Sequence, residues 1–325
     1  MSEENRKAIR ISVRNLVEFV LRSGDIDNRR SGNAQKDAML AGGRIHRKIQ
    51  KRMGSGYRAE VPLKHEVQDE EQEITLLVEG RADGIFTENG IPVIDEIKGM
   101  YTDISRLEEP IEVHLAQAMC YGYFYCCDKD LDGIRLQMTY CNLETEEIKR
   151  FQTDRSREEL ETWFSSVVHE YFKWARYLYH HELTRDASIG HLEFPFPYRA
   201  GQRDLVVSVY RTVSRKKRLF IQAPTGIGKT LSTVFPAVRA IGEGKGDKLF
   251  YLTAKTVTRT VAEEAFRILR DHGLIFTSVT ITAKEKPLSH GPECECNPGT
   301  HAHTRKATLT GSMRRYSIFS TWNRR

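Results

Sequence analysis

The sequence predicts an α/β protein made of two successive units. Strand and helix patterns alternate over roughly the first 185 residues, and a stiff, proline-containing joint follows at 193–198. A short apolar segment then leads through a glycine-rich loop into a helix. The chain has 325 residues, which is long enough for about two domains with separate cores. We therefore expect units at 1–185 and 186–297, followed by a tail at 298–325.

The first unit shows strand runs bounded by turn residues and helix patterns of period 3.6. These features predict a mixed sheet flanked by helices. Helical patterns occur at 11–20, 44–49, 112–126 and 156–181, and strand patterns at 57–67, 74–78, 84–86, 92–97 and 134–141. The last helix is rich in aromatic residues, which is typical of a helix that packs a core or an interface.

The amino-acid composition and the polar N-terminus favour a soluble protein over a membrane or secreted one. Hydrophobic residues make up 39% of the chain and charged residues 29%, and no apolar run approaches the length that spans a membrane. The first residues are polar and lead into no apolar signal-peptide core, so we expect a cytoplasmic protein without a membrane partner. The six cysteines then indicate thiols or metal ligands more than disulfides.

Two carboxylates and a lysine form a first candidate site. Glu96 and Lys98 are two apart on a predicted strand and share one face, whereas Asp95 points to the other. With Asp83 and His46, this face offers oxygen and nitrogen ligands for Mg²⁺ or Mn²⁺. Such a metal activates water at a phosphodiester, and the lysine positions the nucleophile or stabilises the transition state. The alternative for His46 is a partly buried helix histidine without a ligand role.

The next predicted helix carries a matching pair. Gln117 and Tyr121 are four residues apart and share one helix face, from which they can orient the scissile strand or the environment of Lys98. The competing interpretation is a plain surface pair or a core tyrosine. Four further cysteines lie near this region and are best explained as buried structural thiols. They are Cys120, Cys126, Cys127 and Cys141.

The order of these pieces resembles the RecB-like branch of the PD-(D/E)XK nucleases. The resemblance is carried by His46, Gly-Arg-Ala-Asp-Gly at 80–84, Asp-Glu-Ile-Lys at 95–98, and the Gln117 and Tyr121 pair. It implies a nuclease-like core that cleaves nucleic acid with a divalent metal. The residues that it marks as catalytic are Asp83, Glu96, Lys98, Gln117 and Tyr121, and those that it marks as metal ligands are His46, Asp83 and Glu96.

The segment at 223–230 reads as a phosphate-binding loop. An apolar strand is expected at 219–222, the glycines let the backbone wrap a phosphate, and a helix N-terminus follows. Lys229 is expected to reach the β- and γ-phosphates of ATP, and the Thr230 hydroxyl to bind Mg²⁺. The loop residues assigned to nucleotide binding are Thr225, Gly226, Gly228, Lys229 and Thr230.

This second unit resembles the start of a DinG/XPD-type DNA helicase with its RecA-like ATP-binding domain. Arg199 and Gln202, within the segment at 194–202, match the adenine-reading segment that precedes the loop. The segment at 248–256 matches the next helicase strand and its DNA-contacting turn. A simple domain-entry turn and an ordinary core strand are the respective alternatives. The resemblance implies ATP as cofactor and DNA as partner, single-stranded or with free ends.

The resemblance then fails in two respects. The helicase family carries a four-cysteine iron-sulfur insert, but here only Cys294 and Cys296 lie close together, with His301 and His303 as possible Zn²⁺ partners. No apolar strand ending in Asp-Glu follows Thr230, although ATP hydrolysis requires such an acid. We therefore expect a truncated helicase domain that binds ATP weakly and does not hydrolyse it alone. A partner protein could supply the missing half of the helicase.

The tail is basic and contains no acid after Glu295. It resembles no helicase sequence and is read as either a disordered basic tail or an aberrant end, and it would attract DNA in both cases.

Two other functions stay open at this point. One is a nucleic-acid-binding fragment without catalysis, and the other is a small-molecule P-loop enzyme, which predicts an acceptor pocket and acidic ligands after the loop.

Overall fold

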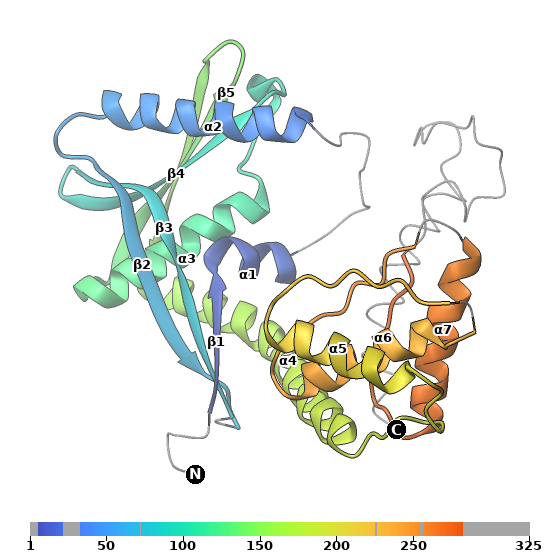
Figure 1. Cartoon of the computed structure of the whole chain (residues 1–325). Helices are drawn as coiled ribbons and strands as arrows, with labels where there is room; N and C mark the ends of the chain where they lie inside the picture. Colours follow the sequence, from blue (N-terminus) through green and yellow to red (C-terminus); the bar gives the residue numbers. More distant parts are fainter. Residues whose placement is uncertain (1–5, 22–32, 72, 225, 254–255, 282–325) are drawn as a thin grey trace, which may run out of the picture. The chain divides into compact units, whose positions relative to one another are not determined.

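The computed structural model describes residues 6–21, 33–71, 73–224, 226–253 and 256–281. The chain divides into two compact units between Arg176 and Tyr177 (Figure 1). This division falls inside the long helix α4 (Arg157–Gly190), which also contains the boundary expected after residue 185. Three sequence-based assignments lie outside the described residues, namely Thr225, the pair Cys294 and Cys296, and the tail at 298–325.

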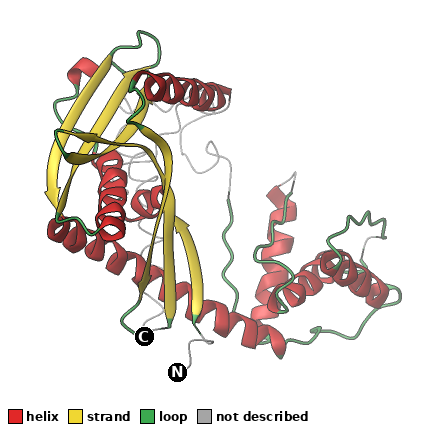
Figure 2. Ribbon diagram, turned by 90° about the vertical axis from the view of Figure 1, so that its left-hand side faces the viewer, coloured by secondary structure: helices red, strands yellow, loops and turns green. Residues whose placement is uncertain are grey.

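The first unit is a mixed sheet with helices, and its strands are yellow in Figure 2. Its six strands follow the order β1-β3-β4-β5-β6, with β2 paired to β3. The pairs β1/β3 and β4/β5 are parallel and the other pairs are antiparallel. The strands are β1 (Lys7–Ser12), β2 (Arg58–Gln68), β3 (Ile74–Glu88), β4 (Ile91–Met100), β5 (Gly133–Asn142) and β6 (Ile148–Ser156).

The strand predictions for this unit are confirmed with three differences. The segments predicted at 74–78 and 84–86 are parts of one strand, β3. Strand β1 was missed, and its last two residues, Ile11 and Ser12, were included in the helix predicted at 11–20 because they continue directly into the pattern of α1. Strand β6 was missed because it pairs only with β5 and its residues alternate between half-buried and exposed, so few of them are apolar.

Helices cover the sheet of the first unit. Ile45 and Ile49 of α2 pack against Ile97, whereas Gln117 of α3 bonds Lys98. Neighbouring strand residues point to opposite faces, so α2 and α3 approach β4 from opposite sides. The helices of this unit are α1 (Val13–Val20), α2 (Asn33–Arg52), α3 (Glu112–Lys129), the 3₁₀ turn η2 (Ile104–Arg106) and the first part of α4.

The core of the first unit combines aliphatic side chains of β3 with aromatic side chains of α3 and α4. Ile74, Leu76 and Val78 alternate inward from β3 and are fully buried. The rings of Phe124 and Phe164, on α3 and α4, meet edge to face with centroids 5.2 Å apart, a preferred geometry for aromatic pairs. This packing holds α3 in place, and α3 carries part of the candidate site.

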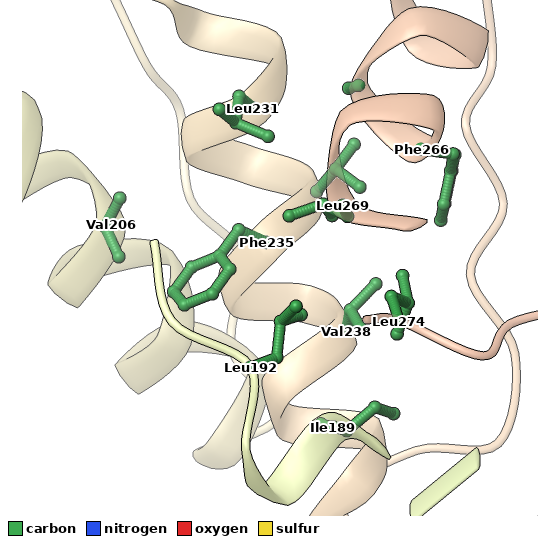
Figure 3. Packing of buried hydrophobic residues seen from close by; sticks show 11 residues of the cluster. Ile189, Leu192, Val206, Leu231, Phe235, Val238, Phe266, Leu269 and Leu274 are labelled. Carbon is green, nitrogen blue, oxygen red and sulfur yellow. The ribbon is translucent and has the colours of Figure 1, made fainter. Parts of the chain in front are cut away.

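The second unit is helical in its described residues. Its helices are the end of α4, α5 (Gln202–Ser214), α6 (Lys229–Gly242) and α7 (Thr256–Asp271). They surround a cluster of eleven buried apolar residues (Figure 3). Val238 and Leu269 are fully buried at its centre, so α6 and α7 contribute most directly to this core.

The strand predicted at 219–222 and the strand expected within 248–256 are wrong, because the described residues of neither segment form a strand. Phe220 is 94% exposed and Leu252 is 88% exposed. An apolar strand is stable only when a neighbouring strand pairs its backbone and a second layer covers its side chains. Neither condition is met here, so the described residues contain no parallel RecA-like sheet. No helix among them has both the length and the apolar character to cross a membrane.

Candidate active site

The candidate site lies at a fork between two strands. Strands β3 and β4 pair from Glu88 and Ile91 as far as Gly84 and Asp95, and the antiparallel ladder ends there. Asp83 and Glu96 come directly after this last pair. Their side chains therefore emerge where the two strands part, and the backbone at this point needs partners other than the neighbouring strand.

Asp83 supplies one of those partners. Its Oδ2 accepts a hydrogen bond of 2.7 Å from the backbone N–H of Ile97. Its Oδ1 lies 3.2 Å from Nδ1 of His46, and the amide of Gln50 donates to its carbonyl oxygen at 2.9 Å. His46 and Gln50 are four apart on α2 and present adjacent side chains. Helix α2 therefore contacts both the side chain and the backbone of Asp83.

Glu96, Lys98 and Gln117 form the second half of the site. The Lys98 ammonium donates to Glu96 Oε1 at 2.7 Å and to Gln117 Oε1 at 2.8 Å. Glu96 is 4% exposed and Gln117 is also buried. The second Glu96 oxygen, Oε2, is buried and has no hydrogen-bond partner among the described residues. Buried carboxylate oxygens are normally paired, so this one marks a position suited to a cation or a donor.

Tyr121 closes the site from α3. Its hydroxyl lies against the backbone of β3, because a Cβ placed on Gly80 would lie 2.6 Å from the hydroxyl oxygen. Burial and the charges of Glu96 and Asp83 raise the pKa of Tyr121, so it stays a neutral phenol. Gly80 is therefore required for the close approach of Tyr121 to β3.

Burial and the neighbouring charges shift the pKa values of the site residues. Burial raises the pKa of Glu96 to about 7, opposed by Lys98 and reinforced by Asp83. Burial lowers the pKa of His46, but its hydrogen bond to Asp83 and the charges of Asp83 and Glu96 outweigh burial, so the net shift is upward. Without a metal, the pocket therefore favours a proton on Glu96 near neutral pH.

A further histidine borders the site and was not found from the sequence. Nδ1 of His114 lies 3.3 Å from the hydroxyl of Tyr140, which accepts the backbone N–H of Ile111 at 2.9 Å. Burial and the nearby Lys98 lower the pKa of His114 to about 4, so its imidazole is neutral. The signal was present, because His114 precedes Gln117 by three residues and shares its helix face.

The opposite face of the fork is a buried hydrogen-bond network. Asp95 is fully buried and accepts from Tyr57 at 2.9 Å, Gln137 at 3.1 Å and Thr139 at 2.6 Å. Thr139 and Gln137 lie on β5, while Tyr57 precedes β2. The sequence placed Asp95 on the other face from Glu96 but gave no sign of its donors, because they come from segments far apart in the chain.

The donor set suits a divalent cation. Carboxylates are typical ligands of Mg²⁺ and Mn²⁺, and Oε2 of Glu96 is an acceptor without a proton donor among the described residues. Asp83 Oδ1, in contrast, is engaged by His46. Within the described ranges, no three His, Cys, Asp or Glu side chains are already gathered into one ligand cluster. A metal at this position therefore has to replace the contact between His46 and Asp83.

The glycine-rich loop of the second unit is held by its own side chains. Gly226 and Gly228 have φ angles of 88° and 78°, which favour glycine, and Gly228 caps α6. Lys229 donates to the carbonyls of Ala223 and Pro224 at 3.0 and 2.8 Å. The Thr230 hydroxyl lies 3.5 Å from that of Tyr251. The Lys229 ammonium and the N-terminus of α6 are thus directed at the loop. An anion bound there would compete with the loop carbonyls for the lysine.

Arg199 and Gln202 contact the same loop. The guanidinium of Arg199 donates to the carbonyl of Gly226, and Gln202 Oε1 accepts from the Arg199 backbone at 3.0 Å. Gln202 is buried, and a Cβ on Gly228 would lie 2.7 Å from its Nε2. The two residues expected to read adenine therefore adjoin the loop expected to bind phosphates.

Comparisons with known proteins support a helicase-like relationship over one short stretch of the chain. No protein-family model matches this chain. A stretch of 52 residues is 36% identical to a probable ATP-dependent helicase of Methanocaldococcus jannaschii, and it spans 15% of this chain and 8% of that relative. The match supports a helicase-like relationship over this stretch. A solved structure titled "Crystal structure of SSO0001" aligns over 52% of this chain and 78% of its own, with 17% identity and a TM-score of 0.33, which is too low to assign a fold.

Proposed function

We propose that this protein processes DNA through a metal-dependent nuclease site in its first unit, joined to an ATP-binding loop in its second. The convergence of six residues on the fork between β3 and β4 carries the nuclease part of the proposal. They come from α2, β3, β4 and α3 and were selected by residue type and spacing. They are His46, Asp83, Glu96, Lys98, Gln117 and Tyr121.

The side chains divide into holding and positioning roles. His46, Asp83 and Glu96 would hold Mg²⁺ or Mn²⁺, which supplies water activation and charge neutralisation at a phosphodiester. Gln117 holds the Lys98 ammonium through its amide oxygen. A fixed ammonium beside two carboxylates can orient a nucleophile and stabilise developing negative charge on a phosphate. Tyr121 fixes the backbone of β3 next to Asp83.

The proposed ATP site rests on the loop geometry and on the helicase-like match. Lys229 and the N-terminus of α6 offer a cation and free N–H groups for phosphates. The similarity to a probable ATP-dependent helicase supports a nucleotide-linked role on nucleic acid. We therefore propose that this loop binds the phosphates of ATP.

Cleavage of end-labelled single-stranded DNA with Mn²⁺ or Mg²⁺ tests the nuclease proposal. Wild type should cut, and Asp83→Ala and Lys98→Ala should each lose at least about 100-fold in rate, the order expected for loss of a group that stabilises transition-state charge. Lys64→Ala, an exposed lysine on β2, is the matched control and should cut normally. Cleavage that survives both site substitutions, or DNA binding without cutting by wild type, would contradict the proposal.

A further inference from the structure

Helix α2 presents three distinct stripes along its described side chains. Ile45 and Ile49 are buried against the sheet. His46 and Gln50 contact Asp83 at the candidate site. The remaining stripe is exposed and basic apart from Leu40, and no acidic residue occurs between positions 40 and 52. The exposed basic residues are Arg44, Arg47, Lys48, Lys51 and Arg52.

The cations differ in whether the protein neutralises them. Lys48 pairs with Glu146, whose pKa is lowered first by this hydrogen bond and also by the charge of Arg52. Among the described residues, no carboxylate is paired with Arg44, Arg47 or Lys51. Other surface cations do pair with a nearby acid, such as Lys129 with Asp128 and Lys173 with Glu170. The three unneutralised charges lie on one helix and form a local positive surface.

Helix geometry places these three charges beside the candidate site. At 3.6 residues per turn, Arg47 lies about 60° around the helix from Gln50, and Lys51 and Arg44 follow on the same side. The rise from Arg44 to Lys51 is about 10 Å, so the stripe runs along the helix for roughly two turns. Helix α2 contacts both β4 and β3, the strands that carry the site (Figure 1). An anionic chain bound along this stripe would therefore pass close to His46.

We infer that Arg44, Arg47 and Lys51 of α2 bind the phosphate backbone of single-stranded nucleic acid and lead it to the fork between β3 and β4. This inference rests on the proposed nuclease function, since the fork is its destination. The occupant follows from charge complementarity, because a row of unpaired cations matches a row of phosphates. Long, flexible basic side chains contact phosphates and do not read base edges. We therefore expect binding that is largely independent of the nucleotide sequence.

Salt-dependent binding tests this inference separately from catalysis. The full chain is titrated in EDTA with a fluorescent oligo-dT of about 20 nucleotides, long enough to span a typical single-strand site. Binding constants are measured between about 50 and 200 mM salt. The variant is Arg44→Gln/Arg47→Gln/Lys51→Gln. Its control, Lys64→Gln/Lys129→Gln/Lys173→Gln, removes the same charge from exposed positions on β2, α3 and α4.

Each phosphate contact contributes about 0.7 to the salt slope for single strands, so the α2 variant should lower the slope by about 2 and bind more weakly. The control should keep the wild-type slope. The basic tail is present in all three proteins and contributes equally. An unchanged slope in the α2 variant, or an equal loss in the control, would overturn the inference. If wild type fails to cleave but the α2 variant still loses the slope, the inference stands as a binding surface and the nuclease proposal fails.

Discussion

The hydroxyl of Tyr57 donates to Asp95 Oδ2 at 2.9 Å, directly behind the residues that carry the candidate site. Asp95 precedes Glu96, and its partner across the ladder, Gly84, follows Asp83. The Tyr57 ring lies against Gly84 and stacks on Phe86 with a centroid distance of 5.8 Å. One aromatic side chain therefore supports both strands at the point where they separate.

Removing only the Tyr57 hydroxyl should destabilise the first unit. Tyr57→Phe keeps the stacked ring but leaves the buried Asp95 carboxylate with two donors in place of three. We expect a loss of about 1–3 kcal/mol in the free energy of unfolding, measured by urea denaturation of the full chain. Tyr125→Phe removes an exposed hydroxyl that accepts from Arg58 and should cost less than about 0.5 kcal/mol. Equal stability of wild type and Tyr57→Phe would show that the bond contributes nothing.

A methyl group at Gly84 should displace the same ring. A Cβ at this position would lie 1.8 Å from the Tyr57 ring, so the ring or β3 must move. We expect Gly84→Ala to lose about 1–3 kcal/mol or more of stability and to slow cleavage, because Asp83 is adjacent. Gly56→Ala has no neighbour within 4 Å and is the control. If the clash is the cause, adding Tyr57→Ala should cost less than the sum of both single changes.

Residue type and spacing were sufficient to find the front of the candidate site. Strand period 2 predicted that Glu96 and Lys98 share a face, and helix period predicted the same for Gln117 and Tyr121. In the structure Lys98 donates to both Glu96 and Gln117. The supporting residues were not predictable in this way. Tyr57 reaches Asp95 only because β2, β3 and β4 pair in one register. Long-range register leaves no local signature in a single sequence.

The strand prediction at 219–222 in the second unit failed for a different reason. Residues 219–222 form an apolar run after a polar turn, which is the pattern of a buried parallel strand. Such a pattern specifies a strand only when partner strands supply its hydrogen bonds and cover its side chains. In the described residues Phe220 is exposed and no ladder forms. The glycine conformations of the loop, in contrast, are local, and the motif at 226–228 predicts them directly.

Stability without metal should fall as the pH rises. The pKa of Glu96 is raised from 4.5 to about 7 in the folded state, so folding favours the protonated acid. The unfolded chain releases this proton first, and stability is therefore lost between about pH 4.5 and 7. The raised pKa of His46 acts in the same direction, because its contribution is present below pH 6.5 and is lost at higher pH.

Urea denaturation in EDTA between pH 4.5 and 8 measures this dependence. Glu96→Gln cannot release the proton and should flatten the decrease, although the His46 part remains. Mn²⁺ competes with the proton on Glu96, so it should stabilise wild type more at pH 8 than at pH 5. Wild type and Glu96→Gln with the same pH profile would contradict the assignment of a raised pKa to Glu96.

Substitution of the loop lysine should separate the two proposed activities. Lys229 donates to the carbonyls of Ala223 and Pro224 and is the cation assigned to the ATP phosphates. Lys229→Ala removes charge-assisted hydrogen bonds of about 1.5–3 kcal/mol, so the affinity for a fluorescent ATP analogue should fall about 10- to 100-fold. Metal-dependent DNA cleavage should keep its wild-type rate, because Lys229 and the fork lie in different units. Lys245→Ala, at an exposed position of the same unit, should change neither activity. Loss of cleavage together with nucleotide binding in Lys229→Ala would mean that the two units do not function independently.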